Sequence, residues 1–305
     1  MVTLPKVLVI ILSWNRKDDT IETIKSLSGS DVTGFDLEIL VVDNSSSDGT
    51  VEEVKKLFPK VKIFINRENL GFAEGNNVGI RYGIEKGFDY IALLNDDTIV
   101  DKNLIKNILE EHKKNEKVGA ISPKIYFAKG FEFHKDKYKE SERGKVIWYA
   151  GGIMDWKNVY GSNRGVDEVD KGQFDEMGET DFATGCFVMY KRKALEEVGL
   201  YDRRFYLYME DADHAQRMKA AGWNVLYSSK GCLWHKVAQS SGIGSELNDY
   251  YLTRNRMLFG LKYASLRTKF ALIRESFKLL ACGRKWQRIG IRDYYLGRFC
   301  KGSWK

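Results

Sequence analysis

The first half of the chain alternates short apolar runs with longer amphipathic segments. Short apolar runs predict buried strands, and segments with an apolar residue at every third or fourth position predict helices. The strands are expected at residues 7–13, 38–43, 61–66, 90–94 and 118–122, and the helices at 18–27, 50–57, 73–86 and 104–114. This alternation is typical of an α/β protein in which helices connect the strands of one sheet.

The second half of the chain is less regular. Residues 129–145 are charged and aromatic without periodicity, which indicates a surface loop, and residues 151–178 indicate loops and short strands. Regular patterns return further on and predict strands at 182–190 and 223–227, helices at 193–198 and 210–221, and a helical segment from 247 almost to 282. We therefore expect a body at residues 1–245 and a helical segment at 246–305.

Composition narrows the class of protein. The chain has 305 residues, of which 43% are hydrophobic, so a sizeable buried core is expected. Its 4 cysteines are scattered without a C-x-x-C pair, which argues against a disulfide scaffold or a zinc finger and favours the reducing cytoplasm. The longest apolar run near the start, residues 7–12, is too short for a secretory signal or a membrane span.

The net charge of +7 is unevenly distributed along the chain. Residues 262–305 contain 12 Lys and Arg against two acidic residues, a net charge of +10, so the rest of the chain carries −3. Aromatic residues are interleaved with these cations, a composition that favours an anionic membrane surface rather than nucleic acid, with a solvated helical face as the alternative. We expect the part after about Lys262 to be dispensable for turnover in solution.

Polar residues follow several predicted strands, where open α/β sheets bind ligands. Asp43 opens a run of amides and hydroxyls and can accept a hydrogen bond from a nucleobase imide or a ribose hydroxyl; a turn that caps the next helix is the alternative. Gly71, Gly75 and Gly79 recur at every fourth position, which allows close approach of either a ligand or a strand. The G-x-G-x-x-G dinucleotide motif is absent.

Two acidic clusters are candidates for chemistry. Asn95-Asp96-Asp97 ends a buried strand, and oxygen ligands of this kind suit Mg²⁺ or Mn²⁺, with helix capping as the alternative. Glu210 and Asp211 open a later helix behind a hydrophobic stretch, an environment that suits a general base, although acidic residues also stabilise helix starts electrostatically. His235 is a candidate ligand or a structural histidine.

Taken together and in this order, these segments resemble the family 2 glycosyltransferases, the inverting GT-A enzymes that include bacterial rhamnosyltransferases. The resemblance runs from about residue 7 to residue 256. It is carried by Ser13-Trp14-Asn15-Arg16, the 41–50 and 69–79 runs, Leu93-Leu94-Asn95-Asp96-Asp97-Thr98, Ala150-Gly151-Gly152, Thr184-Gly185-Cys186, the 198–202 and 205–213 runs with Arg217, His235-Lys236 with Ser240-Ser241, and the 250–256 run. It implies a GT-A, Rossmann-like mixed sheet flanked by helices, with a C-terminal helical basic tail.

The resemblance also implies a role for individual residues. Asp43 would bind the nucleobase or ribose, Asp97 would hold the divalent cation with His235 as a second ligand, and Asp211 would deprotonate the acceptor hydroxyl. Asn95 stands where the family's D-x-D element has its first Asp. Further expected contacts are Asn15, Asn69, Gly71, Asn77, Asn95 and Asp96 on the nucleotide sugar, and Gly185, Glu210 and Arg254 on the acceptor or diphosphate.

The expected activity is inverting transfer of a sugar from a nucleoside-diphosphate sugar, dTDP-rhamnose in preference to a UDP-sugar. The acceptor would be a glycan or a lipid-linked glycan of a cell-surface polysaccharide, reached from the inner face of the cell membrane. Residues 1–117 would bind the donor and residues 118–245 the acceptor. A sugar-phosphate nucleotidyltransferase is one alternative, although residues 13–16 lack the glycine-rich loop it needs. A non-catalytic membrane or nucleic-acid adaptor is another.

Overall fold

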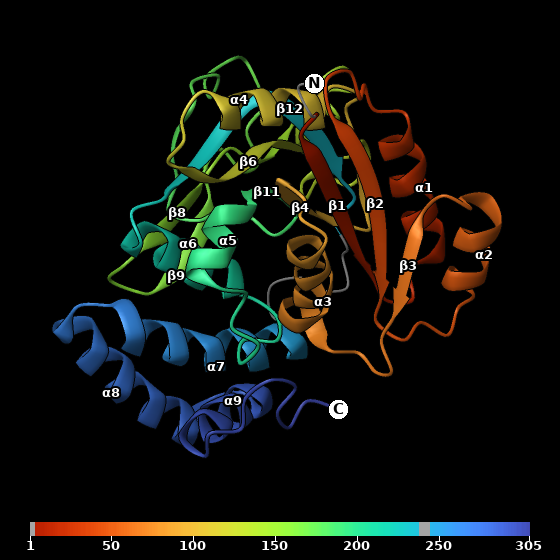
Figure 1. Cartoon of the computed structure of the whole chain (residues 1–305). Helices are drawn as coiled ribbons and strands as arrows, with labels where there is room; N and C mark the ends of the chain where they lie inside the picture. Colours follow the sequence, from red (N-terminus) through yellow and green to blue (C-terminus); the bar gives the residue numbers. More distant parts are fainter. Residues whose placement is uncertain (1–3, 238–244) are drawn as a thin grey trace.

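The computed structural model describes residues 4–237 and 245–305 and contains one large mixed sheet with helices on both faces (Figure 1). Ser240-Ser241 lie outside the described residues. The strands of this sheet are β1 (Lys6–Ser13), β2 (Asp36–Asp43), β3 (Lys62–Ile65), β4 (Tyr90–Asn95), β5 (Thr98–Val100), β6 (Val118–Phe127), β7 (Ile147–Tyr149), β10 (Gly178–Glu179), β11 (Phe187–Lys191) and β12 (Asn224–His235). A separate hairpin consists of β8 (Gly152–Asp155) and β9 (Tyr160–Asn163).

The strand order is β10-β12-β6-β11-β4-β1-β2-β3, with β5 beside β12 and β7 beside β6. Strands β1 to β4 pair in parallel, whereas β11 runs antiparallel to both β4 and β6. The apolar run 7–11 is buried completely because helices cover both faces of β1. The mixed α/β sheet expected from the sequence is therefore confirmed.

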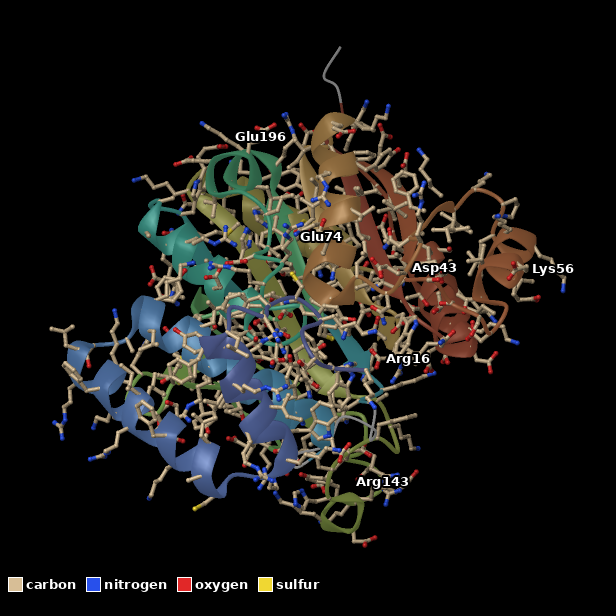
Figure 2. All side chains as sticks on the ribbon, turned by 90° about the horizontal axis from the view of Figure 1, so that it is seen from below. Arg16, Asp43, Lys56, Glu74, Arg143 and Glu196 are labelled. Carbon is tan, nitrogen blue, oxygen red and sulfur yellow. The ribbon has the colours of Figure 1, made fainter. Side chains whose placement is uncertain are left out.

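The register of the parallel strands brings their polar ends together. Ser13 of β1 lies beside Asp43 of β2, and Leu12 lies beside Asn95 of β4. Because parallel strands end at the same edge of a sheet, the residues that follow β1, β2 and β4 share one edge. Figure 2 labels Arg16 and Asp43 on this side of the molecule.

The α-helices are α1 (Lys17–Ser28), α2 (Thr50–Leu57), α3 (Gly71–Glu85), α4 (Leu104–Lys113), α5 (Arg192–Val198), α6 (Glu210–Ala220), α7 (Glu246–Tyr263), α8 (Leu266–Cys282) and α9 (Lys285–Tyr295). Helix α3 packs against β1, β2 and β4. A Cβ atom at Gly75 or Gly79 would lie 2.6 or 2.7 Å from Leu12 or Ile10, so these glycines allow the helix to approach β1. Of the two roles expected for these glycines, close approach of a strand rather than of a ligand therefore applies to Gly75 and Gly79.

Several element boundaries differ from the sequence expectation, and three of the differences have a clear physical reason. β12 continues to His235 through an irregularity between Ser228 and Cys232, where polar residues interrupt the apolar pattern. The helical pattern from 247 to 282 is divided by Ser265, whose side chain caps α8 by accepting from the Thr268 backbone N–H. The strand expected at 182–190 begins only at Phe187 because the preceding residues form the connection between the two acidic clusters.

The C-terminal helices are part of the packed structure. Lys262 Nζ lies 2.6 Å from Asp213 Oδ1 on α6, and the Tyr250 hydroxyl donates to Asp293 at 2.6 Å. The Cys300 backbone N–H donates to the Arg204 carbonyl at 3.1 Å, just before the second acidic cluster. These residues support the loop that leads into α6, so we now predict, against the sequence expectation, that the chain after about Lys262 is needed for turnover in solution.

Among the described residues, no helix combines the length and the apolar character that crossing a bilayer requires.

Candidate active site

The two acidic clusters meet across a short connection that precedes β11. The Asn95 backbone N–H donates to the Cys186 carbonyl at 2.9 Å, and the Gly185 N–H points to Asp211 Oδ2 at 3.4 Å. Two adjacent residues of the connection therefore contact one cluster each. The cluster at the end of β4 and the cluster at the start of α6, more than a hundred residues apart in sequence, belong to one site.

The end of β2 keeps one free acceptor. Asp43 is buried, and its Oδ2 accepts a hydrogen bond from the Ser46 backbone N–H at 2.9 Å, which closes the predicted turn. Its Oδ1 has no hydrogen-bond partner among the described residues. Asn15 fixes the same loop, since its Oδ1 accepts from the Ser47 N–H at 2.7 Å. Asp43 thus closes the turn with one oxygen and leaves the other available to a ligand. A ligand is expected there because buried acceptors normally have a hydrogen-bond partner.

Asn69, Gly71 and Asn77 connect the two halves of the chain. Asn69 Oδ1 accepts from the Gly71 N–H at 2.9 Å, and a Cβ at Gly71 would lie 2.4 Å from the Tyr206 ring. Both ends of the Asn77 amide bind the backbone of Tyr201, at 2.9 and 3.0 Å. These residues hold the start of α3 against the segment that leads into α6, and the amide of Asn77 is occupied by that contact.

Asp97 lies between two cationic side chains. Its Oδ1 is 3.0 Å from His235 Nε2, and its Oδ2 is 3.2 Å from Arg16 Nη1. The pairing of β5 with β12 explains the first contact, because His235 stands directly opposite Thr98. Although burial disfavours its charge, His235 and Arg16 hold the pKa of Asp97 below its usual value. Burial likewise opposes the imidazolium, but Cys186 and Asp97 raise the pKa of His235 well above its usual value.

Asp96 differs from its neighbour although both carboxyls are buried. Burial and the adjacent charge of Asp97 raise the pKa of Asp96 to about 8. Only Asp97 therefore presents a stable carboxylate at neutral pH. Asn95 adds no charge to the cluster, and its backbone N–H is bound to the Cys186 carbonyl.

The residues around Asp97 are suited to hold a divalent cation whose remaining ligands a nucleotide would supply. The Asp97 carboxylate and a neutral His235 imidazole are ligands that Mn²⁺ and Mg²⁺ accept, so the imidazolium that pairs with Asp97 would give up its proton when an ion binds. His235 Nδ1 is buried without a hydrogen-bond partner among the described residues. Within residues 4–237 and 245–305, no group of three or more His, Cys, Asp or Glu is arranged around a common point. Nucleotide phosphates commonly supply the remaining ligands of such ions.

Asp211 stands at the start of α6, and no ion pair to it is formed within the part of the chain that the structure describes. Its Oδ1 accepts from the Ala212 N–H at 2.7 Å and its Oδ2 from the Gly185 N–H at 3.4 Å. Burial raises the pKa of Asp211 to about 6, even though these backbone N–H groups favour the charge. Burial and the Asp211 charge raise the pKa of Glu210 well above its usual value, and Glu210 Oε2 has no partner among the described residues. The pair thus has one carboxyl that ionises near neutral pH, as a general base requires.

Asp213, two residues further along, is surrounded by donors. It is completely buried and pairs with Arg217 at 2.8 Å and Lys262 at 2.6 Å, while the Tyr263 hydroxyl donates to it at 2.8 Å. Its carboxylate therefore anchors α6 to α7. This contrast distinguishes the candidate base from a structural carboxylate on the same helix.

The loop before Asp211 has an unusual backbone that α7 stabilises. Tyr206, Tyr208 and Met209 all have positive φ, at 65°, 71° and 70°, which is costly for residues other than glycine. Asn255 Nδ2 lies within 2.9 Å of the carbonyl oxygens of Phe205, Leu207 and Tyr208 and donates to them.

Arg254 binds the same loop from inside the protein. Its guanidinium is completely buried and donates to the carbonyls of Phe205 and Arg204 at 2.9 and 3.1 Å and to that of Cys300 at 2.7 Å. This burial does not support the contact with an acceptor or a diphosphate that the resemblance implies, and in this structure the guanidinium binds the backbone of the loop instead.

Two residues of the site were not singled out from the sequence. Arg16 ends the Ser13-Trp14-Asn15-Arg16 motif. Because β1 and β4 are neighbours, this cation directly after β1 could have been predicted to lie beside the acidic residues that follow β4. Asn255 could not have been found from spacing, because its three acceptors are backbone carbonyls about fifty residues earlier in the chain.

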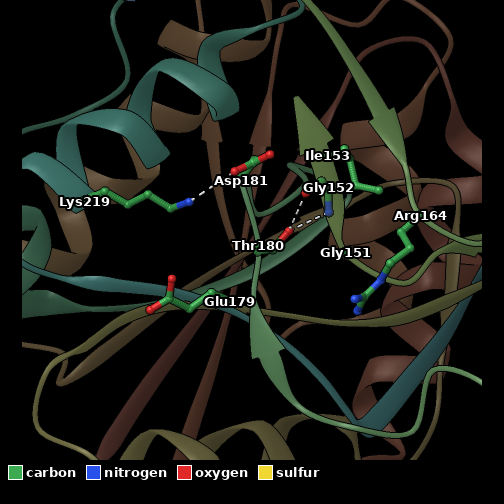
Figure 3. A pocket seen from close by; sticks show the side chains of 8 residues that line it. All are labelled: Gly151, Gly152, Ile153, Arg164, Glu179, Thr180, Asp181 and Lys219. Carbon is green, nitrogen blue, oxygen red and sulfur yellow. Dashed lines mark hydrogen bonds and ion pairs between the residues drawn. The ribbon is translucent and has the colours of Figure 1, made fainter. Parts of the chain in front are cut away.

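A cavity of about 220 Å³ lies apart from both clusters (Figure 3). It is lined by Gly151, Gly152, Ile153, Arg164, Glu179, Thr180, Asp181 and Lys219. Its residue Lys219 is eight residues along α6 from Asp211, about 12 Å along the helix axis. None of the residues predicted for the site lines this cavity.

Comparison with known proteins agrees with this geometry. The family model described as "Glycosyl transferase family 2" matches residues 8–199. N-acetylglucosaminyl-diphospho-decaprenol L-rhamnosyltransferase of Mycobacterium tuberculosis is 25% identical over 218 residues, which are 68% of each chain. Poly-beta-1,6-N-acetyl-D-glucosamine synthase of Staphylococcus epidermidis is 23% identical over 76% of this chain, which spans about half, 50%, of that relative.

A solved structure shows the same fold at low sequence identity. The mannosyltransferase PcManGT from Pyrobaculum calidifontis, in complex with GDP-Man and Mn²⁺, aligns with a TM-score of 0.56 at 16% identity, over 97% of this chain and 75% of that one. The GT-A arrangement is thus confirmed, and the nucleotidyltransferase and adaptor alternatives are set aside. Because the family model matches residues 8–199, the chain belongs to glycosyl transferase family 2 and is a glycosyltransferase.

Proposed function

We propose that this glycosyltransferase moves a sugar from a nucleoside-diphosphate sugar to a hydroxyl group, with inversion at the anomeric carbon. The observation that carries the proposal is the meeting of two unlike acidic clusters across residues 185 and 186. Asp97 contacts His235 and Arg16, and a positively charged environment of this kind suits a diphosphate and its metal ion. Among the described residues Asp211 has no such cationic partner, which suits a proton acceptor.

The donor is a dTDP- or UDP-linked sugar, with dTDP-rhamnose favoured. The free Oδ1 of Asp43 can accept the imide N–H that uracil and thymine share, so this contact does not separate the two bases. The relative from M. tuberculosis is named as an L-rhamnosyltransferase, which supports rhamnose. That name also contains a decaprenol diphosphate, and we propose a glycan or lipid-linked acceptor used in cell-surface polysaccharide synthesis.

The donor half would hold the leaving diphosphate. Asp97 and His235 are positioned to bind Mg²⁺ or Mn²⁺, and a bound cation would neutralise the charge that develops on the diphosphate. Arg16 brings a second positive charge to Asp97 and is 29% exposed, so it can also face a phosphate. The complex of PcManGT with Mn²⁺ is consistent with such an ion.

The acceptor half would supply the base. As the acceptor oxygen forms its bond to the anomeric carbon, the bond from that carbon to the diphosphate breaks and the acceptor proton passes to Asp211. With a pKa of about 6, Asp211 is ionised at neutral pH yet basic enough to accept the proton. Glu210 stays protonated beside it, which avoids two adjacent buried charges.

Calorimetric titration tests the donor assignment. We expect dTDP-rhamnose or a UDP-sugar to bind in the presence of Mg²⁺ or Mn²⁺ and to bind much more weakly after chelation. The anomeric configuration of the product, read by NMR, should be opposite to that of the donor. Equal affinity with and without the cation would remove Asp97 from its proposed role, and a product of retained configuration would contradict the mechanism.

A further inference from the structure

Helix α8 exposes a stripe of large apolar side chains. Leu266, Phe270 and Phe277 are 74%, 72% and 61% exposed. At about 100° per residue, the spacings of four and seven residues place all three within roughly 40° around the helix axis. Surface aromatic residues are common singly, but three in one row form a continuous apolar strip.

A row of cations borders this strip. Arg267, Arg274 and Lys278 are exposed and follow one another at spacings of seven and four residues. On the helical wheel they lie roughly 40–80° to one side of Phe270. In the described part of the chain none of the three forms an ion pair. Their charge is therefore available to a partner, and the whole segment 262–305 carries a net charge of +10.

The strip extends onto the end of α9, and the opposite side of α8 is firmly packed. The rings of Phe277 and Tyr295 stack with centroids 6.2 Å apart, and Tyr295 and Leu296 are 47% and 58% exposed. Leu272 and Ser276 are buried on the inner side. We call the exposed surface made by Leu266, Arg267, Phe270, Arg274, Phe277, Lys278, Tyr295 and Leu296 the α8 face. It is a preformed surface, because the inner side fixes its orientation.

We propose that the α8 face lies on an anionic phospholipid membrane. Its apolar strip would enter the boundary between headgroups and acyl chains, and its cations would contact the headgroup phosphates. A second copy of this chain is a poorer occupant, because two such faces would bring their unpaired cations together. An apolar strip bordered by positive charge is complementary to a surface that is apolar inside and negative outside.

This inference rests on the proposed function, because a lipid-linked acceptor would be held in the same membrane. Helix α7 connects the α8 face to the site: it packs on α8, and its Lys262 and Asn255 hold α6 and the loop before Asp211. Figure 1 shows α7 between α8 and the α/β body. Binding through the α8 face would place α7, and with it the support of the loop before Asp211, on the side of the protein that faces the bilayer.

Vesicle flotation of the full chain tests the inference. The probes are phosphatidylcholine vesicles with and without phosphatidylglycerol. We expect binding only to the anionic vesicles, and a loss of about 10-fold or more in Phe270→Ser with Phe277→Ser. Arg274→Gln with Lys278→Gln should lose about 10- to 30-fold, with the remaining binding less sensitive to salt. Phe133→Ser is the matched control, since Phe133 is 58% exposed but lies outside the α8 face.

Hydrolysis of the donor in solution and light scattering accompany each variant. The proposal predicts that all three variants hydrolyse donor like the parent, so that a loss of vesicle binding is separate from any failure of the proposed function. Vesicle binding that survives both double substitutions would overturn the inference. A parent dimer that the phenylalanine substitutions convert to monomer would also overturn it and assign the face to a second copy of the chain.

Discussion

The two acidic clusters of the site are held in place by different means. Asp97 lies at the end of a buried parallel strand, and the sheet register alone puts it beside His235 and close to Arg16. Asp211 follows a loop with three positive-φ residues, which depends on hydrogen bonds from α7. One cluster is therefore built by the sheet, and the other by a strained loop with distant support.

The electrostatics of the clusters differ in the same way. Cations compensate Asp97 and hold its pKa below the usual value, whereas burial without a cation raises the pKa of Asp211 to about 6. A compensated carboxylate is suited to binding charge, and an uncompensated one is suited to accepting a proton. Changes to the supports of each cluster should thus affect different steps of the reaction.

The largest effect is expected from truncation before α8. Ending the chain at Ala264 removes Cys300 and Asp293 and exposes the buried Tyr250 and Tyr251, so α7, which supports the second cluster, loses the helices packed on it while the sheet is untouched. We expect insoluble protein or a fall in melting temperature of more than about 10 °C. A truncated protein that folds and turns over like the parent would show that the C-terminal helices do not support the site.

Asp97→Asn should affect the donor step. It removes a charge that would hold the cation, so the affinity for nucleotide sugar in the presence of Mn²⁺ should fall by about 10- to 100-fold. Calorimetry measures this directly. Asp101→Asn is the control, because Asp101 lies four residues further along and its side chain accepts a local N–H from Asn103. Equal losses in the two variants would point to general destabilisation rather than to a cation site.

Asn255→Ala should affect the transfer step instead. It removes the side-chain donor that the carbonyls of Phe205, Leu207 and Tyr208 share, although Arg254 still binds the first of them, so the base loses part of its support and kcat should fall by about 10-fold. Donor affinity should be unchanged, because Asp43 and Asp97 are positioned by the sheet and not by this loop. Asn163→Ala, which removes a similar side-chain bond to the Trp148 carbonyl, should alter neither quantity. A parallel loss of donor affinity in Asn255→Ala would contradict the division between the two clusters.

The smallest effect concerns stability against pH. Because folding raises the pKa of Asp211 from 3.8 to about 6, the folded state favours the protonated form, and this contribution to stability is lost as the pH rises through about 6. Asp211→Asn removes the penalty. Its gain in unfolding free energy should be near zero at pH 4 and reach about 1–3 kcal/mol at pH 7.5. Urea unfolding at the two pH values measures the gain, and a gain independent of pH would exclude Asp211 as its source.

The sequence was sufficient to place the cluster around Asp97 and insufficient to place the cluster around Asp211. Strand periodicity predicted the ends of β1, β2 and β4, and parallel pairing then required Asp43 and Asp97 to share one edge. The positive-φ loop and the Asn255 contacts follow from tertiary packing, which local patterns do not encode. Arg254 illustrates how little a motif says about tertiary contacts. Its place in the family motif suggested a ligand contact, whereas in the structure it is buried and binds the Phe205 carbonyl.

Steady-state kinetics of Asp211→Asn beside Asp213→Asn tests the central claim most directly. The two carboxylates share helix α6, but only Asp211 lacks a cation, so Asp211→Asn should lower kcat by roughly 10²- to 10⁴-fold with donor affinity unchanged. Asp213→Asn should mainly lower stability, because it leaves Arg217 and Lys262 unpaired. Full transfer activity in Asp211→Asn would contradict the account, whichever residue then proved to accept the proton.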